Sequence, residues 1–147
     1  MMPSLVGVSH LSFSVPDVAE AARFWVEVLG FEPRNDDPEF RFVFHREARL
    51  AVVLTDHAGT VGDVFDEHHA GLDHLALAVA DVDTLEQFRA ELDERRVPHS
   101  GVVASDGGWH LNLRGPGNFP IELFVIAEAF VRSLGLDPAE PAVAGRH

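Results

Sequence analysis

The sequence contains no cysteine and no tyrosine. The absence of cysteine excludes disulfide bonds, thiolate metal sites and a cysteine nucleophile. No apolar run approaches the roughly 20 residues that a membrane-spanning helix needs. The first residues also lack the basic and then apolar segments of a signal peptide, so we expect a cytoplasmic protein.

Basic residues are scarce. The chain of 147 residues has 11 Lys and Arg against 24 Asp and Glu, a formal net charge of −13. Binding to a phosphate backbone or to an anionic membrane needs clustered positive charge, so we expect neither nucleic acid nor membrane as a partner. The length fits one compact domain, or two small halves that share a core.

One phrase occurs twice in the sequence. Gly7-Val-Ser-His-Leu-Ser-Phe-Ser-Val-Pro-Asp-Val18 returns 64 positions later as Gly71-Leu-Asp-His-Leu-Ala-Leu-Ala-Val-Ala-Asp-Val82. The alignment places His10 on His74, and in both copies an alternating run leads into Asp-Val and a helical pattern. Such internal similarity predicts two half-domains that each begin with a histidine-bearing strand.

Apolar spacing predicts the same series of elements in both halves. The first half is predicted to form strand, helix and three strands at residues 5–15, 18–29, 31–34, 40–46 and 50–55. The second half is predicted to form the same series at 74–79, 84–92, 97–103, 109–114 and 119–126, followed by a short helix at 128–136. Two βαβββ modules, and therefore an α+β fold, are expected.

The expected boundaries follow from these elements. They are 1–56 for the first module, 57–70 for a connector and candidate mobile flap, 71–127 for the second module, and 128–147 for a short helix and flexible tail. The Pro- and Ala-rich composition of the tail is typical of disordered termini.

The two strands that carry the histidines have one bulky face and one face of small residues. In the first, Leu11 and Phe13 alternate with His10 and serines, and His74 alternates with leucines in the same way. A helix is expected to cover the bulky face, which leaves room for a cavity on the other. Two imidazoles that converge on a cavity suit a metal site, although a single such histidine is more often a satisfied, half-buried residue.

Glu122 is the third candidate ligand. It stands in the otherwise apolar run Pro120-Ile-Glu-Leu-Phe124. A carboxylate inside an apolar strand is costly unless it is paired or bound to a metal. Alternation places it on the histidine face, and its counterpart in the first half is Val53. The alternative interpretation is an ion pair of Glu122 with Arg114 or Arg41.

At these residues the chain resembles the vicinal oxygen chelate superfamily, which includes glyoxalases, methylmalonyl-CoA epimerase, extradiol ring-cleaving dioxygenases, fosfomycin-resistance enzymes and bleomycin-sequestering proteins. The resemblance covers nearly all of residues 7–125. The phrases that carry it are Val8-Ser-His-Leu-Ser-Phe-Ser-Val-Pro-Asp17, Phe24-Trp, Leu29-Gly-Phe31, Leu72-Asp-His-Leu-Ala-Leu-Ala-Val79 and Arg114-Gly-Pro-Gly-Asn-Phe-Pro-Ile-Glu-Leu-Phe124.

The resemblance implies paired βαβββ modules whose curled mixed sheets form a cup around a divalent ion. His10, His74 and Glu122 match the ligands of that ion, which would be Fe²⁺, Mn²⁺, Ni²⁺ or Zn²⁺. Members of this size are commonly homodimers, sometimes with the site built from both chains. The fourth ligand of the glyoxalases and the epimerase would fall at about Val53, which cannot coordinate a metal.

The leading hypothesis is therefore a metal-dependent enzyme acting on a small, oxygen-rich substrate that chelates the ion. A ring-cleaving dioxygenase is slightly favoured over a glyoxalase-like lyase or isomerase, although the tyrosine that dioxygenases use is missing. His110 and His57 are the candidate catalytic proton shuttles. The rival hypothesis is a non-catalytic protein that sequesters an antibiotic in a groove lined by aromatic side chains, namely Trp25, Trp109 and the alternating Phe40, Phe42 and Phe44.

Overall fold

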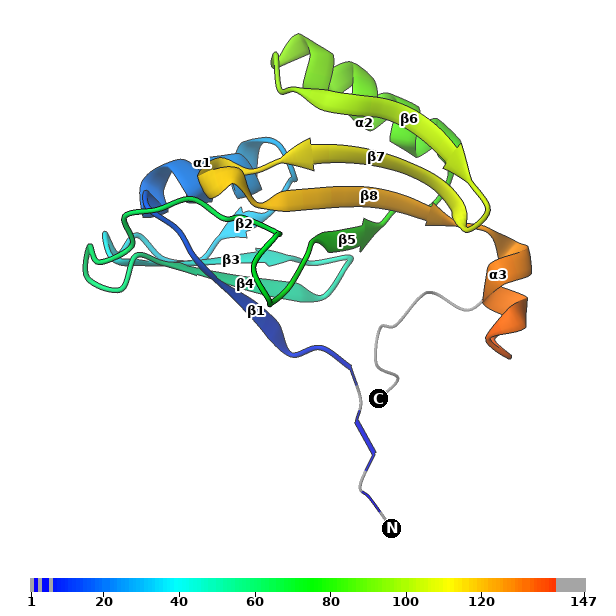
Figure 1. Cartoon of the computed structure of the whole chain (residues 1–147), viewed down its shortest axis with the longest axis horizontal. Coiled ribbons are helices and arrows are strands. Elements are labelled where there is room, and N and C mark those ends of the chain that lie inside the picture. Colours follow the sequence, from blue (N-terminus) through cyan, green and yellow to red (C-terminus); the bar gives the residue numbers. More distant parts are fainter. Residues whose placement is uncertain (1, 3, 6, 140–147) are drawn as a thin grey trace. The chain divides into compact units, whose positions relative to one another are not determined.

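The computed structural model describes residues 2, 4–5 and 7–139 of the chain (Figure 1). The described chain divides into two compact units between Val64 and Phe65, a point inside the predicted connector. None of the helices in this part of the chain has the length and apolarity that crossing a bilayer requires. Residues 140–147, where most of the predicted flexible tail falls, lie outside the described residues.

The first unit has the βαβββ order that the sequence predicts. Its elements are β1 (His10–Ser14), α1 (Val18–Glu27), β2 (Glu32–Pro33), β3 (Phe40–His45) and β4 (Leu50–Thr55). The four strands form one mixed sheet in the order β1-β4-β3-β2, with β1 parallel to β4 and the other pairs antiparallel. α1 begins after Asp17, whose carboxylate accepts a hydrogen bond from the Glu20 backbone N–H at 2.8 Å.

The second unit repeats this order. Its elements are β5 (Leu75–Ala78), α2 (Val82–Glu94), β6 (His99–Ser105), β7 (Gly108–Arg114), the single turn η1 (Pro116–Asn118) and β8 (Pro120–Ile126), followed by α3 (Glu128–Ser133). The sheet order β5-β8-β7-β6 matches that of the first unit element by element, again with the first pair parallel. The predicted α+β fold of two βαβββ modules is confirmed.

In each unit a helix packs on one face of the sheet. In unit 1, α1 buries Val18, Ala21 and Trp25, and Trp25 contacts Phe13 of β1 at a ring-centroid distance of 5.5 Å. In unit 2, α2 buries Leu85 and Leu92 against β6, β7 and β8. Burying these side chains supplies most of the stability of units this small.

The histidine-bearing strands begin later than the sequence pattern predicts. β1 begins at His10 and β5 begins at Leu75, so His74 lies one residue before its strand. In β5 the first paired residue is Leu75, opposite Ile121, and Pro120 just before Ile121 has no N–H to donate to the ladder. α2 begins at Val82, before the predicted start, because the Asp81 carboxylate caps it by accepting the Thr84 N–H at 2.8 Å.

The second half of the predicted connector is anchored to unit 2. The Phe65 N–H donates to the Gly117 carbonyl at 2.8 Å, and the Asn118 side chain donates to the Phe65 carbonyl at 3.1 Å. The Phe65 ring also contacts Phe119 edge-on at 4.7 Å. This segment is therefore held against the turn that leads into β8, and its role as a connector and flap stays a prediction.

Candidate metal centre

Glu122 lies on the face of the unit 2 sheet that α2 does not cover. Strand register places it directly between Ala76 of β5 and Asn112 of β7. The opposite face of the same strands carries side chains that are at most 9% exposed, namely Leu111, Leu113, Ile121, Leu123 and Val125. Because strand side chains alternate between faces, burying these residues under the helix fixes Glu122 on the uncovered face.

The Glu122 side chain is only 17% exposed, and its Oε2 lies 3.6 Å from Nε2 of His74. That separation is too long for a hydrogen bond, which rarely exceeds about 3.2 Å. A cation about 2.1 Å from each of two ligand atoms in tetrahedral geometry would place those atoms about 3.4 Å apart. The pair therefore has the spacing and the donor types of two ligands of one divalent ion.

Each arginine considered as a partner for Glu122 pairs with another carboxylate in its own unit. The Arg114 guanidinium donates to the Glu67 carboxylate and to the Asn118 carbonyl. Arg41 donates to the Asp36 carboxylate. Within unit 2, Glu122 is thus not paired with Arg114, and the ionisable side chain 3.6 Å from its carboxylate is that of His74.

The imidazole of His74 is held from its other side as well. Its Nδ1 lies 2.7 Å from Oδ2 of Asp73, a hydrogen-bond distance. Sequence reasoning missed Asp73, although the only signal needed was a carboxylate directly beside a candidate ligand histidine. It also missed Asn112, whose exposed amide lies directly opposite Glu122 and belongs to the polar side of an alternating strand.

His110, a predicted proton shuttle, lies on the same face as Glu122. Its register partner is Phe124, and the two rings are stacked with centroids 6.3 Å apart and planes 5° from parallel. Since Asn112 is opposite Glu122, His110 is a diagonal neighbour of Glu122, at a distance of about 7–8 Å between Cα atoms. Unit 2 therefore holds three of the five predicted site residues, of which His74 and Glu122 approach each other within 3.6 Å and His110 shares their face of the sheet.

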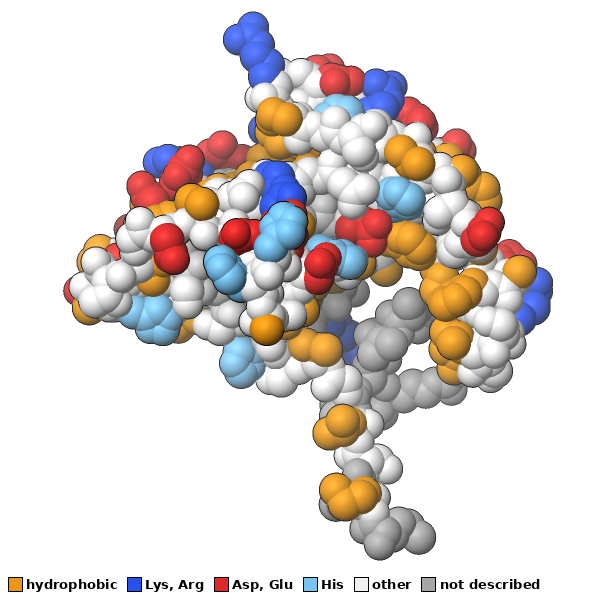
Figure 2. Space-filling view, in the orientation of Figure 1, with side chains coloured by type: hydrophobic (Ala, Val, Ile, Leu, Met, Phe, Trp, Pro, Cys, Tyr) orange, Lys and Arg blue, Asp and Glu red, His pale blue; other side chains and the backbone are white. Residues whose placement is uncertain are grey.

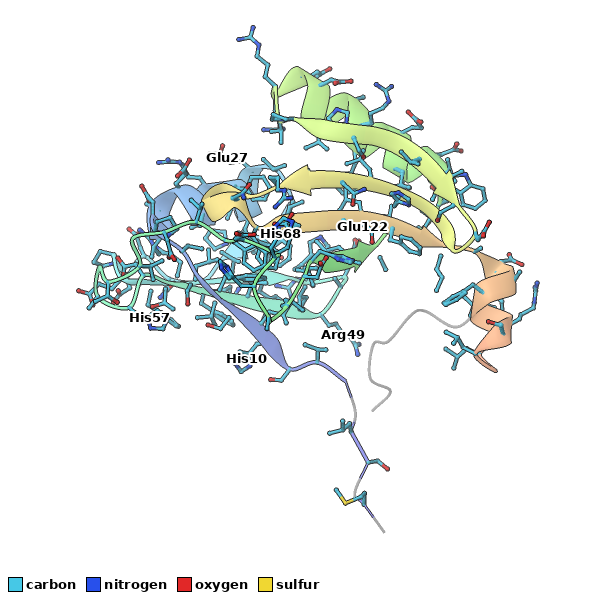
Figure 3. The ribbon with its side chains drawn as sticks, viewed as in Figure 1. His10, Glu27, Arg49, His57, His68 and Glu122 are labelled. Atoms are coloured by element: carbon cyan, nitrogen blue, oxygen red, sulfur yellow. The ribbon has the colours of Figure 1, made fainter. Side chains whose placement is uncertain are left out.

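The other two predicted residues, His10 and His57, belong to unit 1 (Figure 3). His10 is exposed at the start of β1, with Nδ1 3.1 Å from the Ser9 hydroxyl. Nε2 of His57 is 2.9 Å from the hydroxyl of Ser14, the last residue of β1. Ser14 is four positions after His10, a span of about 13 Å along a strand, so His57 is at the opposite end of β1 from His10.

Register also identifies the counterpart of Glu122 in unit 1. Val53 lies between Ser12 of β1 and Phe42 of β3, as Glu122 lies between Ala76 and Asn112. The uncovered face of unit 1 thus carries valine at the position where unit 2 carries a carboxylate.

A second group of ligand-type side chains lies in the anchored segment, where Asp66, Glu67 and His68 place one such atom each within 4.8 Å of one another. These three side chains already form hydrogen bonds with other groups of the protein. Hydrogen bonds from Arg114 lower the pKa of the Glu67 carboxyl from 4.5 to about 2. The backbone N–H of His68, followed by its ring, lowers the pKa of Asp66, and the Asp66 carboxylate in turn raises the pKa of His68.

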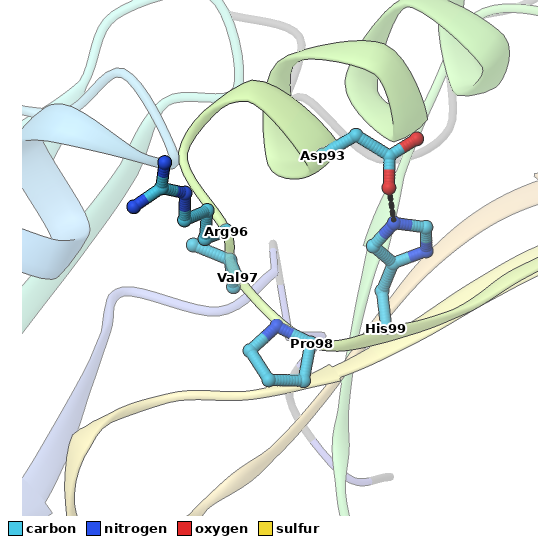
Figure 4. A pocket seen from close by; sticks show the side chains of 5 residues that line it. All are labelled: Asp93, Arg96, Val97, Pro98 and His99. Atoms are coloured by element: carbon cyan, nitrogen blue, oxygen red, sulfur yellow. Dashed lines mark hydrogen bonds and ion pairs between the residues drawn. The ribbon is translucent and has the colours of Figure 1, made fainter.

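A shallow, open depression of about 370 Å³ lies where α2 ends and β6 begins (Figure 4). Its His99 side chain is 10% exposed and spans two partners, the Asp93 carboxylate at 3.0 Å and the Gly101 N–H at 3.0 Å. His99 is paired with Leu113, whose side chain lies on the helix-covered face. The depression therefore belongs to the side of the sheet away from Glu122, and His99 acts as a clamp between α2 and β6.

Charged side chains of both signs are mixed on the surface. In the space-filling view, the arginine side chains are scattered among acidic ones, with no continuous basic patch among the described residues of that face (Figure 2).

Comparison with solved structures finds the same fold in proteins of different function. A glyoxylase/bleomycin resistance protein/dioxygenase domain from Frankia sp. EAN1pec is 28% identical, with a TM-score of 0.74 over 84% of this chain and 100% of that one. The antibiotic-binding protein TnmS3 from Streptomyces sp. CB03234 is 25% identical, with a TM-score of 0.64 over 86% of this chain and 100% of that one.

A third similar structure is the fosfomycin resistance protein FosX from Listeria monocytogenes, in complex with Mn(II) and sulfate. It is 15% identical, with a TM-score of 0.69 over 89% of this chain and 99% of that one, and at this identity it shows the shared fold alone. No curated protein matches the sequence. The family model for the Glyoxalase/Bleomycin resistance protein/Dioxygenase superfamily matches residues 7–123. The chain therefore belongs to the Glyoxalase/Bleomycin resistance protein/Dioxygenase superfamily.

Proposed function

We propose that the protein is a metal-dependent enzyme acting on a small, oxygen-rich substrate that chelates a divalent ion. His10, His74 and Glu122 would hold the ion. The observation that carries the proposal is the pair His74–Glu122, a carboxylate 17% exposed in an apolar strand with an imidazole nitrogen 3.6 Å away. The donor set of two imidazoles and one carboxylate suits Fe²⁺, Mn²⁺, Ni²⁺ or Zn²⁺.

Three protein ligands would leave coordination positions for two vicinal substrate oxygens. The bound ion would supply Lewis-acid stabilisation of the negative charge that develops on the substrate. Val53, at the place where a fourth ligand would stand, favours a ring-cleaving dioxygenase over a glyoxalase-like lyase or isomerase. Oxygen consumption with a catechol, set against isomerisation of a hemithioacetal, distinguishes the two reactions.

We assign proton transfer to His110, because it shares a face with Glu122 and its ring is held by stacking on Phe124. His57 is the second candidate, and its hydrogen bond to Ser14 lies at the far end of β1 from His10. Replacing His110 with alanine is expected to lower kcat by about 10²–10⁴-fold, as loss of a general acid–base does. His57→Ala is the matched control, and a larger loss in that variant would transfer the role to His57.

The second candidate function is sequestration of an antibiotic without turnover. The observation that favours it is the row of Phe40, Phe42 and Phe44 on the uncovered face of unit 1, together with 25% identity to an antibiotic-binding protein. Aromatic side chains on an open sheet face suit a flat apolar ligand. Such binding would need neither His74 nor Glu122.

Elemental analysis of anaerobically purified protein tests the proposal. We expect about one divalent ion per chain, lost in His10→Ala, His74→Ala and Glu122→Ala. Iron would point to oxygen chemistry, and nickel or zinc to isomerisation. A metal-free wild type that binds an antibiotic, with the affinity unchanged in all three variants, would contradict the enzyme and support sequestration.

We further propose that the protein acts as a homodimer in the cytoplasm. Light scattering of the purified protein tests the dimer, and mixing His10→Ala with Glu122→Ala chains tests whether one site uses both chains. Recovery of metal binding in the mixture would mean a shared site, because each chain would then supply the ligand that the other lacks.

A further inference from the structure

In both copies of the repeat, the residue before the histidine contacts its Nδ1. Asp73 Oδ2 lies 2.7 Å from Nδ1 of His74, and the Ser9 hydroxyl lies 3.1 Å from Nδ1 of His10. Asp73 and Ser9 are themselves 64 positions apart, which is the offset of the repeat. Both copies of the repeat thus make a contact to the Nδ1 atom of the histidine, one from a carboxylate and the other from a hydroxyl.

An ionised carboxylate accepts hydrogen bonds and cannot donate them. Its contact with Nδ1 of His74 therefore requires the proton of the neutral imidazole to be on Nδ1, which leaves the lone pair on Nε2. Nε2 is the atom that lies 3.6 Å from Glu122, so the lone pair is on the side of the ring where a shared cation would bind.

We propose that Asp73 is a positioning residue that fixes His74 as an Nε2 metal ligand, an assignment that rests on the proposed metal site. Asp73 would select the tautomer of His74 and hold the plane of its ring before the metal binds. The free-energy cost of ordering the ring would then not be incurred on metal binding. Asp73 would not touch the metal or the substrate.

The two halves differ in how firmly they hold their histidine. The Ser9 hydroxyl can donate to Nδ1 or accept from it, so it does not select a tautomer of His10. The proposal therefore makes His74 and Glu122 the preorganised part of the site and His10 the adaptable ligand. Loss of the Asp73 contact should weaken metal binding more than loss of the Ser9 contact.

The expected loss of metal affinity depends on how exposed the side chains of Asp73 and His74 are. Removing a residue that supports a metal ligand typically costs about 10–100-fold in affinity. The Asp73 side chain is 73% exposed and that of His74 is 47% exposed, so water competes for Nδ1. We expect Asp73→Ala to weaken Zn²⁺ binding about tenfold, and Ser9→Ala to weaken it by less than about threefold.

The experiment combines Zn²⁺ affinity, measured by chelator competition, with ¹⁵N NMR of the His74 ring in the metal-free protein. Wild type should show the proton on Nδ1, whereas Asp73→Ala should show a mixture of tautomers. Because Asp73 is exposed, Asp73→Ala should retain the wild-type unfolding midpoint. Measurements at about 0.1 M and about 1 M salt separate positioning from simple charge attraction, which the higher salt screens to about 3 Å.

A tenfold loss that persists at high salt, together with the tautomer change, supports the proposal. An unchanged tautomer, a loss that vanishes at high salt, or an equal loss in Ser9→Ala would overturn it. A wild type that binds no metal would contradict the proposed function, while the tautomer measurement would still decide whether Asp73 orients His74.

Discussion

The uncovered faces of the two units differ far more than their helix-covered faces do. In unit 1 the central row reads Ser12, Val53 and Phe42 across three strands, whereas in unit 2 the same row reads Ala76, Glu122 and Asn112. The flanking positions differ in the same way, with Phe40 and Phe44 on β3 of unit 1 and with His110 and Arg114 on β7 of unit 2. The open face of unit 1 is rich in aromatic side chains, whereas that of unit 2 carries several polar side chains beside Phe124.

The helix-covered faces have kept the same kinds of residue. Val52 and Leu54 of unit 1 correspond to Ile121 and Leu123 of unit 2, and all four are at most 2% exposed. Volume and apolarity under a helix are constrained by packing, and a change of even one methylene there is felt. The open face carries no such constraint, so there the copies have diverged into different chemistry.

The comparison predicts that Glu122→Val, which gives unit 2 the central residue of unit 1, removes the metal site without harming the fold. We expect the affinity for Zn²⁺ to fall by more than the ~10–100-fold that follows loss of a residue supporting a ligand. The free energy of unfolding of the metal-free protein should not decrease, because a half-buried carboxylate is replaced by an apolar side chain. Metal titration and urea unfolding measure the two effects.

Glu122→Gln is the control for shape, since it keeps the volume and removes the charge. Full retention of metal by either variant would mean that Glu122 is not a ligand. A large loss of stability in the metal-free Glu122→Val protein would instead make the carboxylate a structural group.

The helix-covered cores of the two units, in contrast, should lose similar amounts of stability when one buried leucine is truncated. Leu54→Ala and Leu123→Ala each remove a side chain that is at most 2% exposed from the same place in the repeat. Each change is expected to lower the free energy of unfolding by about 2–5 kcal/mol, through lost transfer energy and the cavity left behind. Urea denaturation followed by circular dichroism checks both. A cost in one unit and none in the other would show that the two helix-covered cores are not equivalent.

The difference between the two faces of each sheet also explains which structural features could be predicted from the sequence. Strict alternation, with Leu11 and Phe13 against His10 and Leu111 and Leu113 against His110, was enough to predict the strands, the buried faces and the α+β fold. Glu122 could be assigned to the open face for the same reason. These inferences depend only on a period of two, which any strand enforces.

The contacts of individual side chains could not be predicted in this way. The pairing of Arg114 with Glu67, rather than with Glu122, depends on the path of the segment around Phe65 and on side-chain rotamers. The Asp73 contact joins neighbours in the chain, which alternation would place on opposite faces. The roles of His10 and His57 in a shared site stay predictions, because His10 belongs to one unit and Glu122 to the other.

Val53→Glu reverses the comparison by giving unit 1 the carboxylate of unit 2. Without metal, we expect it to lower the free energy of unfolding by about 1–3 kcal/mol, since a charge enters a half-buried apolar position next to Phe42. Zn²⁺ should restore part of this loss if the new carboxylate completes a four-ligand set. Urea unfolding with and without Zn²⁺ measures both effects. An identical cost in the two conditions would place Val53 away from the metal.

The weakest expected effect concerns two Arg–Glu pairs, one in each unit. Arg46 pairs with Glu32 in unit 1 at 3.2 Å, and Arg114 pairs with Glu67 in unit 2. Because Arg114 lowers the pKa of Glu67 to about 2 from 4.5, its stabilisation is fully present above pH 4.5 and is lost as the pH falls toward 2. The difference in unfolding free energy between wild type and Glu67→Gln should follow this window.

Glu32→Gln is the matched control for this measurement, because both partners of its pair are more exposed and such surface pairs contribute little. The segment that Glu67 anchors packs on the turn leading into β8, the strand of Glu122. If the pair serves that strand, Glu67→Gln should also weaken Zn²⁺ binding slightly at neutral pH, whereas Glu32→Gln should not. Equal metal affinity in both variants would mean that the Arg114–Glu67 pair contributes only to folding stability. The position of Glu122 would then be determined by the sheet alone.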